Sequence, residues 1–381
     1  MTASLDDFLD RLGGPALLAW HRENGTALPA EAYLGLYRDR LVRGLGNTLL
    51  IYLDTNFWVR LRDAARRTGS AEAVRLLQTL RAMVHRREAL CVSQIYSLLE
   101  VGKQEEQSLR ITADLLDELT EGVAIASTDD LLRWECAQFV AATVQRDVTQ
   151  GLCPWTKAGQ IHRSQLPALP GPATVAGGRA VLKASIDSLW NLSFEDAFDR
   201  LDWDTKNKLG FQLDDEVLAS VEKRKAERLA KGYTLDEVRA SEFEQQVRAQ
   251  LMPIATELLR AWHISRSFPE GMVALLRDLR TVEMAAVEQF KGRSLGRLLP
   301  GLSIRTELYA LYETDGDAKK PISSNDWFDS SHAAAALPYC DVFLTERNLA
   351  HKLRQMLKAD AQYGCLVIGS LEEALARFSG E

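Results

Sequence analysis

The chain has 381 residues, of which 46% are hydrophobic and 26% charged, and its formal net charge at pH 7 is −7. This length predicts two or three structural units, and the acidic balance counts against a protein that coats nucleic acid through a broad basic surface. No apolar run has transmembrane length and no secretory signal is evident, so we expect a cytoplasmic protein without a membrane partner.

The five cysteines form no CxxC pair, and two of them, Cys91 and Cys365, lie in apolar strand-like runs. This usage favours reduced and mostly buried thiols over a disulfide framework or a zinc site.

Residues 1–46 are expected to form an N-terminal helical extension with two amphipathic helices, over about 5–22 and 30–45. From 47 to 128, apolar runs alternate with amphipathic segments, which predicts the first part of an α/β core. The strands are expected at 47–53, 89–93 and 122–127, and the helices at about 57–87 and 94–119.

This alternation stops over residues 129–317, which are rich in helix formers and predict a helical insertion. The helices are expected near 179–200, 214–231, 234–264, 269–291 and 303–313.

The alternation resumes in residues 318–381, which predict the second part of the α/β core. Its expected elements are helices at 326–337, 348–361 and 372–378 and strands at 341–345 and 365–370. Because strands separated by helices form right-handed parallel crossovers, the whole chain predicts an α/β fold with a five-stranded parallel sheet and helices on both faces.

Acidic side chains stand where ligands bind in such sheets, beyond the carboxyl ends of the strands. Asp54 directly follows the first strand, where it would either bind Mg²⁺ or Mn²⁺ or cap the next helix. Glu100 lies among Leu98, Leu99 and Val101, and a glutamate among apolar residues is unusual unless it is paired or bound to a metal. A solvent-facing position on its helix is the alternative for Glu100.

Asp326 and Asp329 are spaced to share one face at the start of a helix, where the helix dipole favours anions. Asp326 would cap the helix or assist as an auxiliary ligand, and Asp329 is the stronger candidate for a metal ligand. His332, on the same face, is expected to pack or to support a ligand more often than to bind the metal itself. Glu346 follows the fourth strand at its carboxyl end. Asp341 begins that strand at the opposite edge, so we interpret it as structural.

Other enzymes with an aspartate after the first strand are excluded by their motifs. Haloacid-dehalogenase-type phosphatases have DxDx[TV] where this chain has DTN at 54–56. The chain also lacks a GxxxxGK[ST] phosphate loop, a glycine-rich dinucleotide turn and a GxSxG nucleophile motif. A site made of carboxylates alone remains.

This pattern resembles the PIN-domain nucleases over about 47–127 and 322–370. LLIYLDTN is similar to the opening strand and first aspartate of that family, VSQIYSLLE to its second motif, and NDWFDSSHAAAALPYCDVFLTE to its third and fourth motifs. Two features depart from the family pattern: Glu346 stands where aspartate is frequent, and the helical insertion is unlike the small toxin members.

The resemblance implies a metal-dependent endonuclease, with RNA as the favoured substrate and a place in a toxin or defence system. Asp54, Glu100, Asp326 and Asp329 would hold Mg²⁺ or Mn²⁺, with Glu346 assisting, and the metal would activate water at the phosphate. The expected substrate contacts are Thr55, Asn56, Thr345 and Arg347, with further cations at Arg60, Arg62, Arg66, Arg67, Lys352 and Arg354. Trp327 and Phe328 would either stack an unpaired base or belong to the core.

Two alternatives stay open at this point. The α/β unit would be a non-cleaving module whose helical insertion binds other molecules, or the enzyme would cut structured DNA. An inhibitory protein partner and a homo-oligomer are both compatible with an intracellular nuclease.

Overall fold

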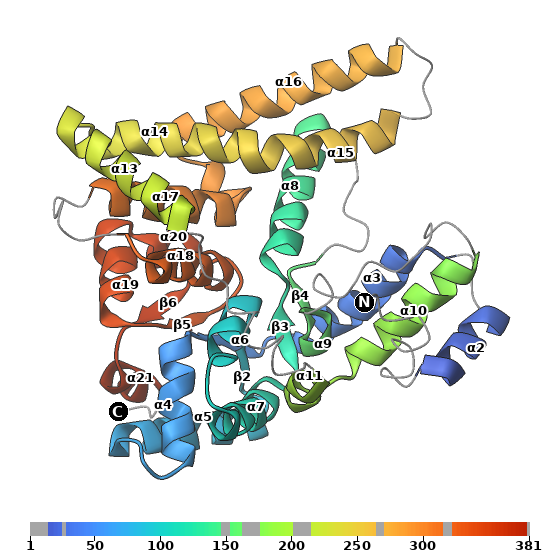
Figure 1. The fold of residues 1–381 in the computed structure, drawn as a ribbon, viewed down its shortest axis with the longest axis vertical. Helices are drawn as coiled ribbons and strands as arrows, with labels where there is room; N and C mark the ends of the chain where they lie inside the picture. The colour runs from blue at the N-terminus through green and yellow to red at the C-terminus, as the bar shows by residue number, and fades with distance from the viewer. Residues whose placement is uncertain are drawn as a thin grey trace. The chain divides into compact units, whose positions relative to one another are not determined.

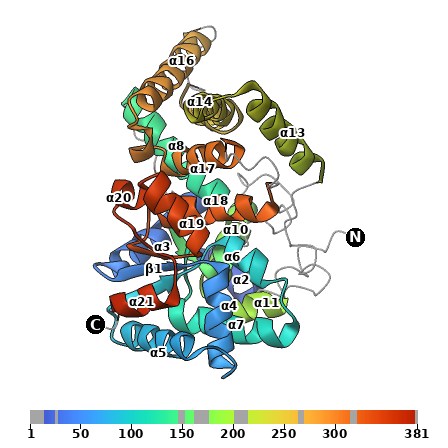
Figure 2. The same ribbon diagram turned by 90° about the vertical axis from the view of Figure 1, so that its left-hand side faces the viewer.

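The structure is a computed structural model that describes residues 14–24, 28–145, 153–161, 176–200, 215–263, 270–314 and 322–378. The chain divides into two compact units. The first comprises Met1–Ser127, Cys153–Gly210 and Tyr339–Glu381, and the second comprises Thr128–Leu152 and Phe211–Pro338. Figures 1 and 2 label the elements of both units. Among the described residues, no helix combines the length and the apolarity needed to cross a bilayer.

A four-stranded parallel sheet in the order β2-β1-β5-β6 lies in the first unit. Its strands are β1 (Leu49–Leu53), β2 (Ala89–Val92), β5 (Val342–Leu344) and β6 (Leu366–Ile368). The central strands are apolar and buried, as their sequence predicts for a parallel sheet covered on both faces. Leu53 of β1 pairs with Leu344 of β5, so the residues that follow these two strands meet at one edge.

The α/β class is confirmed, but the predicted five-stranded sheet is wrong. The third expected strand, β3 (Val123–Ile125), pairs antiparallel with β4 (Trp155–Lys157) in a separate two-stranded sheet. Within the described residues it meets β2 through one bridge, between Ser93 and Ala124. β2 ends at Val92, and β3 meets the chain just past that end, where the Ile125 N–H donates to the Ser93 carbonyl oxygen at 2.9 Å.

Helices follow the strands as predicted, although two long helices are each broken into two. The first pair is α4 (Thr55–Ala65) and α5 (Ala71–His85), and the second pair is α6 (Ile95–Val101) and α7 (Glu106–Thr120). Between α4 and α5, a Cβ on Gly69 would come within 2.7 Å of the backbone nitrogen of Ala64. This close approach needs glycine and turns the chain sharply.

The C-terminal elements occur in the predicted order. They are α19 (Arg347–His351), the π-helical η4 (Lys352–Met356), α20 (Ala359–Tyr363) and, after β6, α21 (Leu371–Phe378). The last helix packs against α5, so the end of the chain covers the helices that follow β1.

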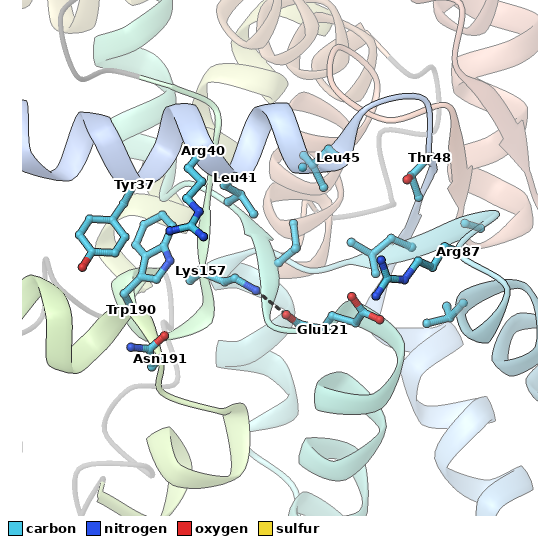
Figure 3. Close-up of a pocket in the computed structure, with 15 residues that line it drawn as sticks. Tyr37, Arg40, Leu41, Leu45, Thr48, Arg87, Glu121, Lys157, Trp190 and Asn191 are labelled. Atoms are coloured by element: carbon cyan, nitrogen blue, oxygen red, sulfur yellow. Dashed lines mark hydrogen bonds between the residues drawn. The ribbon is translucent and has the colours of Figure 1, made fainter.

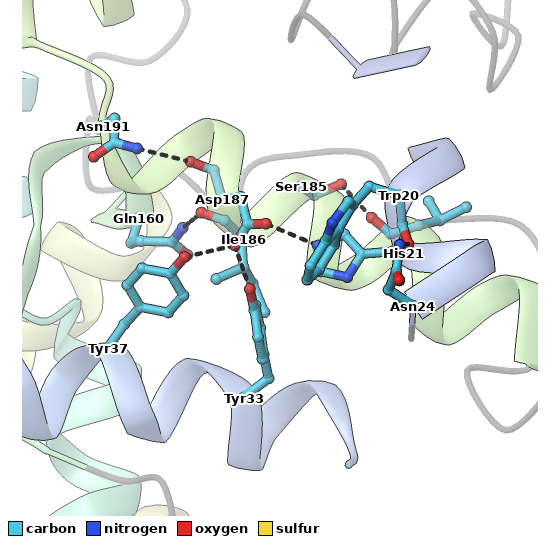
Figure 4. A network of polar contacts seen from close by, with 11 residues as sticks. Trp20, His21, Asn24, Tyr33, Tyr37, Gln160, Ser185, Ile186, Asp187 and Asn191 are labelled. Carbon is cyan, nitrogen blue, oxygen red and sulfur yellow. Dashed lines mark hydrogen bonds and ion pairs between the residues drawn. The ribbon is translucent and has the colours of Figure 1, made fainter. Parts of the chain in front are cut away.

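The N-terminal extension contains the two predicted helices, α2 (Gly14–Asn24) and α3 (Ala30–Leu45); the part of the first expected before residue 14 lies outside the described residues. Both helices pack against α10 (Ala176–Trp190). Asp187 of α10 accepts hydrogen bonds from Tyr33 and Tyr37 at 2.8 and 2.9 Å and contacts His21 Nε2 at 2.7 Å (Figure 4). The first unit also contains α9 (Ala158–Ile161) and α11 (Phe194–Arg200).

The described part of the second unit is helical. Its elements are α8 (Thr128–Val144), α13 (Asp215–Lys231), α14 (Leu235–Gln246), η2 (Val247–Leu251), α15 (Met252–His263), α16 (Glu270–Lys291), η3 (Leu295–Arg297), α17 (Pro300–Thr314) and α18 (Ser324–Ala336). A buried apolar cluster that includes Phe139, Phe243 and Leu299 forms its core. The division differs from one continuous insertion over 129–317, because β4 and α9–α11 belong to the first unit and α18 belongs to the second.

The cysteines are free, and four of the five are buried, which agrees with the expectation of reduced thiols. Burial raises the pKa of Cys91 and of Cys365 to about 12. These thiols therefore stay protonated and unreactive at neutral pH.

Candidate active site

Asp54 stands where the sequence predicted it, directly after β1, and only 5% of it is exposed. Its Oδ1 accepts a hydrogen bond from the Phe57 N–H at 3.0 Å, which caps α4. Its Oδ2 accepts the Thr345 hydroxyl at 2.8 Å and the Glu346 N–H at 3.1 Å. These donors come from residues 291 and 292 positions away in the chain, so the carboxylate joins the ends of β1 and β5.

Glu100 belongs to the same network. It lies half-buried on α6, and the Thr55 hydroxyl donates a short hydrogen bond to its Oε2. Thr55 directly follows Asp54, so two carboxylates from separate elements are connected through one residue. A hydrogen-bonded acid in this position is what the apolar neighbours of Glu100 indicated.

The negative charges of Asp54 and Glu100 also act on the buried side chain of Tyr52 in β1. Its hydroxyl lies 3.4 Å from Ser97 Oγ on α6, and its side chain is fully buried. Burial raises the pKa of Tyr52 well above its ordinary value, and the charges of Asp54 and Glu100 add to that rise. Tyr52 therefore remains a neutral phenol beneath the two acids.

Thr345 has a different task from the predicted substrate contact. Its side chain is completely buried, and its hydroxyl donates to Asp54. A group with no exposed surface positions the aspartate rather than touching a substrate. Likewise, the Thr55 hydroxyl is engaged by Glu100 rather than directed to a substrate phosphate or a water molecule.

Three of the other predicted side chains remain accessible beside the network. Asn56 and Arg347 are exposed, and Glu346 is half-buried at the start of α19. The Arg347 guanidinium lies 3.9 Å from the Glu372 carboxylate, a surface contact that a phosphate can replace at little cost. The exposed edge therefore offers an amide, a carboxylate and a cation around the buried Asp54.

Asp326 and Asp329 lie on α18, in the second unit. The Oδ2 of Asp326 accepts hydrogen bonds from the backbone N–H and the hydroxyl of Ser323, both at 2.8 Å, and the Ser323 hydroxyl accepts the Asp326 N–H at 3.3 Å. This reciprocal capping box accounts for Asp326, but the cap residue is Ser323 rather than Asp326. Asp329 is half-buried one turn further along. Their convergence with Asp54 remains a prediction from the sequence.

The aromatic and histidine residues of α18 divide between surface and interior. Phe328 and His332 are buried, and Trp327 is half-buried with its ring 5.7 Å from that of Phe328. The core alternative therefore holds for Phe328, which has no exposed face for a nucleic-acid base. His332 is buried, as a packed or supporting histidine would be.

Most of the further cations have partners elsewhere. Arg62 pairs with Asp63 at 2.7 Å, Arg66 donates to Ser108 at 3.1 Å and Arg354 lies 3.3 Å from Glu373. Arg60 lies over the Phe57 ring at 5.6 Å. At the opposite edge of the sheet, Asp341 Oδ2 accepts the Leu50 N–H at 2.8 Å, which confirms its structural role.

The donor set of the first unit suits a hard divalent cation, because carboxylate oxygens are the ligands that Mg²⁺ and Mn²⁺ prefer. Hydrogen bonds such as those to Asp54 orient a ligating carboxylate. Within the described residues, however, no group of three or more His, Cys, Asp or Glu side chains is gathered closely enough to hold a metal.

Comparison with known proteins found no match to a family model, to a curated protein or to a solved structure. The function must therefore be argued from the site.

The sequence did not indicate how the predicted acids are held. We did not predict the hydrogen bonds from Thr55 to Glu100 and from Thr345 to Asp54, because a sequence does not reveal which carboxylate a hydroxyl group contacts. The one available signal was the position of each threonine directly at the end of a strand.

Proposed function

We propose that this protein is a divalent-metal-dependent endonuclease that hydrolyses phosphodiester bonds, with RNA as the favoured substrate. The observation that carries the proposal is the network at the carboxyl ends of β1 and β5. There, Asp54 is fixed by donors from both ends of the chain, and Thr55 ties Glu100 to it. Buried charges that the protein holds in fixed positions at the edge of a sheet are candidates for functional groups.

Asp54 and Glu100 would hold Mg²⁺ or Mn²⁺, with Glu346 at the accessible rim. When bound, the metal would lower the pKa of a water molecule and stabilise charge on the phosphate. The chain's own residues supply orientation: Thr345 and the Glu346 N–H fix Asp54, and the Thr55 hydroxyl fixes Glu100. Asn56 and Arg347 are placed to contact the substrate backbone. A contribution from Asp326 and Asp329 is proposed from the sequence alone.

The decisive test assays Asp54→Asn and Glu100→Gln on RNA, on single-stranded DNA and on branched DNA, with Mn²⁺ and with EDTA. We expect the wild type to cut RNA only with metal, and each variant to lose activity by about 100-fold or more, as removal of a metal ligand does. Glu100→Gln is the more informative variant, because an amide oxygen still accepts the Thr55 hydroxyl.

Asp63→Asn is the matched control, since Asp63 lies on α4 and pairs with Arg62 away from the network. It should retain full activity. A wild type that cuts no substrate, or an Asp54→Asn variant that cuts as fast as the wild type, would show that the proposal is wrong. Preference for branched DNA would identify a structure-specific nuclease instead.

One observation favours a second candidate, a non-cleaving binding module. Asp54 already accepts three hydrogen bonds from the protein, which is also how a purely structural carboxylate is held. Calorimetry with Mn²⁺ distinguishes the two: binding that disappears in Asp54→Asn supports the nuclease, and no binding supports the module.

A further inference from the structure

A cavity of about 520 Å³ lies in the first unit at the edge of the sheet where the strands begin (Figure 3). Thr48 and Ala89, at the starts of β1 and β2, line it. Asp54 follows the other end of β1, and five residues of strand span about 16 Å. The cavity is therefore a separate place from the carboxylate network and does not depend on the proposed nuclease activity.

Three cationic side chains from three elements surround this cavity. Arg40 comes from α3, Arg87 from the turn after α5, and Lys157 from the end of β4, whereas Glu121 is the one carboxylate in the lining (Figure 3). The chain as a whole carries a net charge of −7. A local excess of positive charge against that background favours an anionic ligand.

The described residues neutralise these cations only in part. They provide no hydrogen-bond or ion-pair partner for the guanidinium of Arg40 or of Arg87. Lys157 Nζ donates to the backbone carbonyl oxygen of Glu121 at 2.5 Å rather than to a carboxylate. Burial lowers the pKa of Lys157, and the charge of Glu121 opposes that shift.

Another part of the lining is apolar and aromatic, beside Arg40 (Figure 3). Trp190 lies against Tyr37, with ring centroids 5.0 Å apart and the planes inclined by 47°. Leu41 and Val123 complete this wall. A flat ring would pack here while a charged group reached the arginines, since ligand sites combine apolar walls with a few polar anchors.

We propose that this cavity binds a nucleoside phosphate, with its phosphate groups along Arg40, Lys157 and Arg87 and its base against Trp190. The volume lies within the range of small-ligand sites, about 300–1,000 Å³. Arginine suits the phosphate because its planar fork donates two hydrogen bonds at once.

The test measures calorimetric binding to the full chain in EDTA, which prevents metal-dependent cleavage. The probes are inorganic phosphate, the common nucleoside mono-, di- and triphosphates, and a short single-stranded RNA. We expect at least one nucleotide to bind more tightly than phosphate alone. Arg40→Gln and Arg87→Gln should each weaken that binding by about tenfold or more, the loss expected for a charge-assisted contact.

Arg43→Gln and Arg86→Gln are the matched controls, since each lies on the same element as a proposed contact but outside the cavity lining. Both should bind like the wild type. The proposal fails if no nucleotide binds, if phosphate alone binds as tightly as every nucleotide, or if only RNA binds. It also fails if the control variants lose affinity to the same extent as Arg40→Gln and Arg87→Gln.

A second surface, on α16 of the second unit, carries an independent inference. Five large apolar side chains of this helix are exposed: Met272, Val273, Leu276, Met284 and Val287. They make up nearly half of the exposed large apolar residues in the described chain, whereas Leu275 and Val282 on the other face join the core. Exposed apolar side chains that gather on one face of a helix mark a candidate interface.

The order of residues on this face is self-complementary about Arg280. If two copies of α16 pack antiparallel across that residue, Val273 meets Val287, because both lie seven positions from it, and Leu276 meets Met284, because both lie four positions from it. Three positions away, Arg277 meets Glu283 of the other copy, which pairs opposite charges on each side of the axis. The occupant that this pattern fits is the same helix.

We infer that two copies of the chain associate through their α16 helices about a two-fold axis, as isologous dimers do. One helix pair is a small interface, and Arg280 faces its own copy at the axis. The dimer is therefore expected to be weak and to form at micromolar concentrations.

Light scattering or sedimentation over a concentration series tests this dimer. Leu276→Glu should abolish it, whereas Leu36→Glu, at a similarly exposed position of α3, should not. Glu283→Arg should weaken it, and the double variant Arg277→Glu with Glu283→Arg should restore it. Arg280→Leu should strengthen it. A monomeric wild type at every concentration, or a charge reversal that the double variant does not restore, would refute the inference.

Discussion

Asp54 caps a helix with one carboxylate oxygen, and this cap does not exclude the metal-binding role that we propose for it. From the sequence the two were equal alternatives. In the structure, Oδ1 caps α4 through the Phe57 N–H while Oδ2 faces Thr345 and Glu346. The cap fixes the rotation of the carboxylate, and a fixed carboxylate is what a metal requires.

Substitutions of Thr345 test how the hydrogen bond from its hydroxyl group fixes the Asp54 carboxylate. Thr345→Val keeps the shape of the buried side chain but removes the donor to Asp54, whereas Thr345→Ser keeps the donor. We expect Thr345→Val to lower the free energy of unfolding by about 1–3 kcal/mol, because a buried acceptor loses a partner. Mn²⁺ affinity should fall about tenfold or more, as for other residues that orient a metal ligand. Denaturant unfolding and calorimetry check both values; equal behaviour of the two variants would contradict the role.

Asp117 predicts a dependence of stability on pH. It accepts the N–H groups of Phe194 and Glu195 at 2.7 and 3.1 Å at the start of α11. Burial nevertheless raises its pKa, so the folded protein binds this proton more readily than the unfolded chain. The stabilisation is complete below the pKa of the unfolded aspartate, about 3.9, and is lost as pH rises through the folded pKa.

Unfolding of the wild type and of Asp117→Asn at a series of pH values measures this contribution. The stability of the wild type relative to the variant should improve as pH falls from neutral to acidic. A difference that is constant with pH, or that changes in the opposite direction, would show that the carboxylate is not shifted as described.

At the scale of elements, the periodicity of apolar residues and the length of apolar runs were enough to place most helices and the four strands of the parallel sheet. They failed where a close contact or a distant partner determines where an element begins or ends. The break after α4 depends on the close approach of Gly69 to Ala64, which periodicity does not reveal. β4 consists of three residues, WTK, and exists because β3 offers it an edge. A partner that is distant in the sequence creates such a strand, so the local pattern contains no sign of it.

Two glycines give a matched test of packing between elements. A Cβ on Gly159 of α9 would lie 2.0 Å from the Leu189 carbonyl oxygen at the end of α10, whereas one on Gly44 of α3 would meet nothing within 4 Å. Gly159→Ala should destabilise the protein by about 1–3 kcal/mol or more, because backbone atoms must move. Gly44→Ala should be neutral or stabilise α3 by up to about 1 kcal/mol, the difference in helix propensity. Thermal unfolding compares them, and similar effects would show that α9 and α10 tolerate separation.

At the scale of the molecule, the sequence predicted one site assembled from distant motifs, and the structure describes part of it within one unit. Asp54, Glu100 and Glu346 are joined there because β1 lies between β2, which precedes the helix of Glu100, and β5 in the sheet. Asp326 and Asp329 belong to the second unit, where α18 packs against α17. The boundary could not be seen in the sequence, since α18 and β5 follow each other with only 337–341 between them.

Metal binding should therefore leave a local signature in the first unit. A ligand that binds only the native state adds about 2.7 kcal/mol of stability at 100 times its dissociation constant, and that gain slows the opening of the segments that hold it. We expect Mn²⁺ to slow amide hydrogen exchange in β1 with α4 and in α6, and EDTA to reverse the effect. Asp54→Asn should abolish the protection, and Asp63→Asn should retain it. Because this measurement requires no cleavage, protection without activity would identify a metal-binding module, whereas protection that survives in Asp54→Asn would place the metal elsewhere.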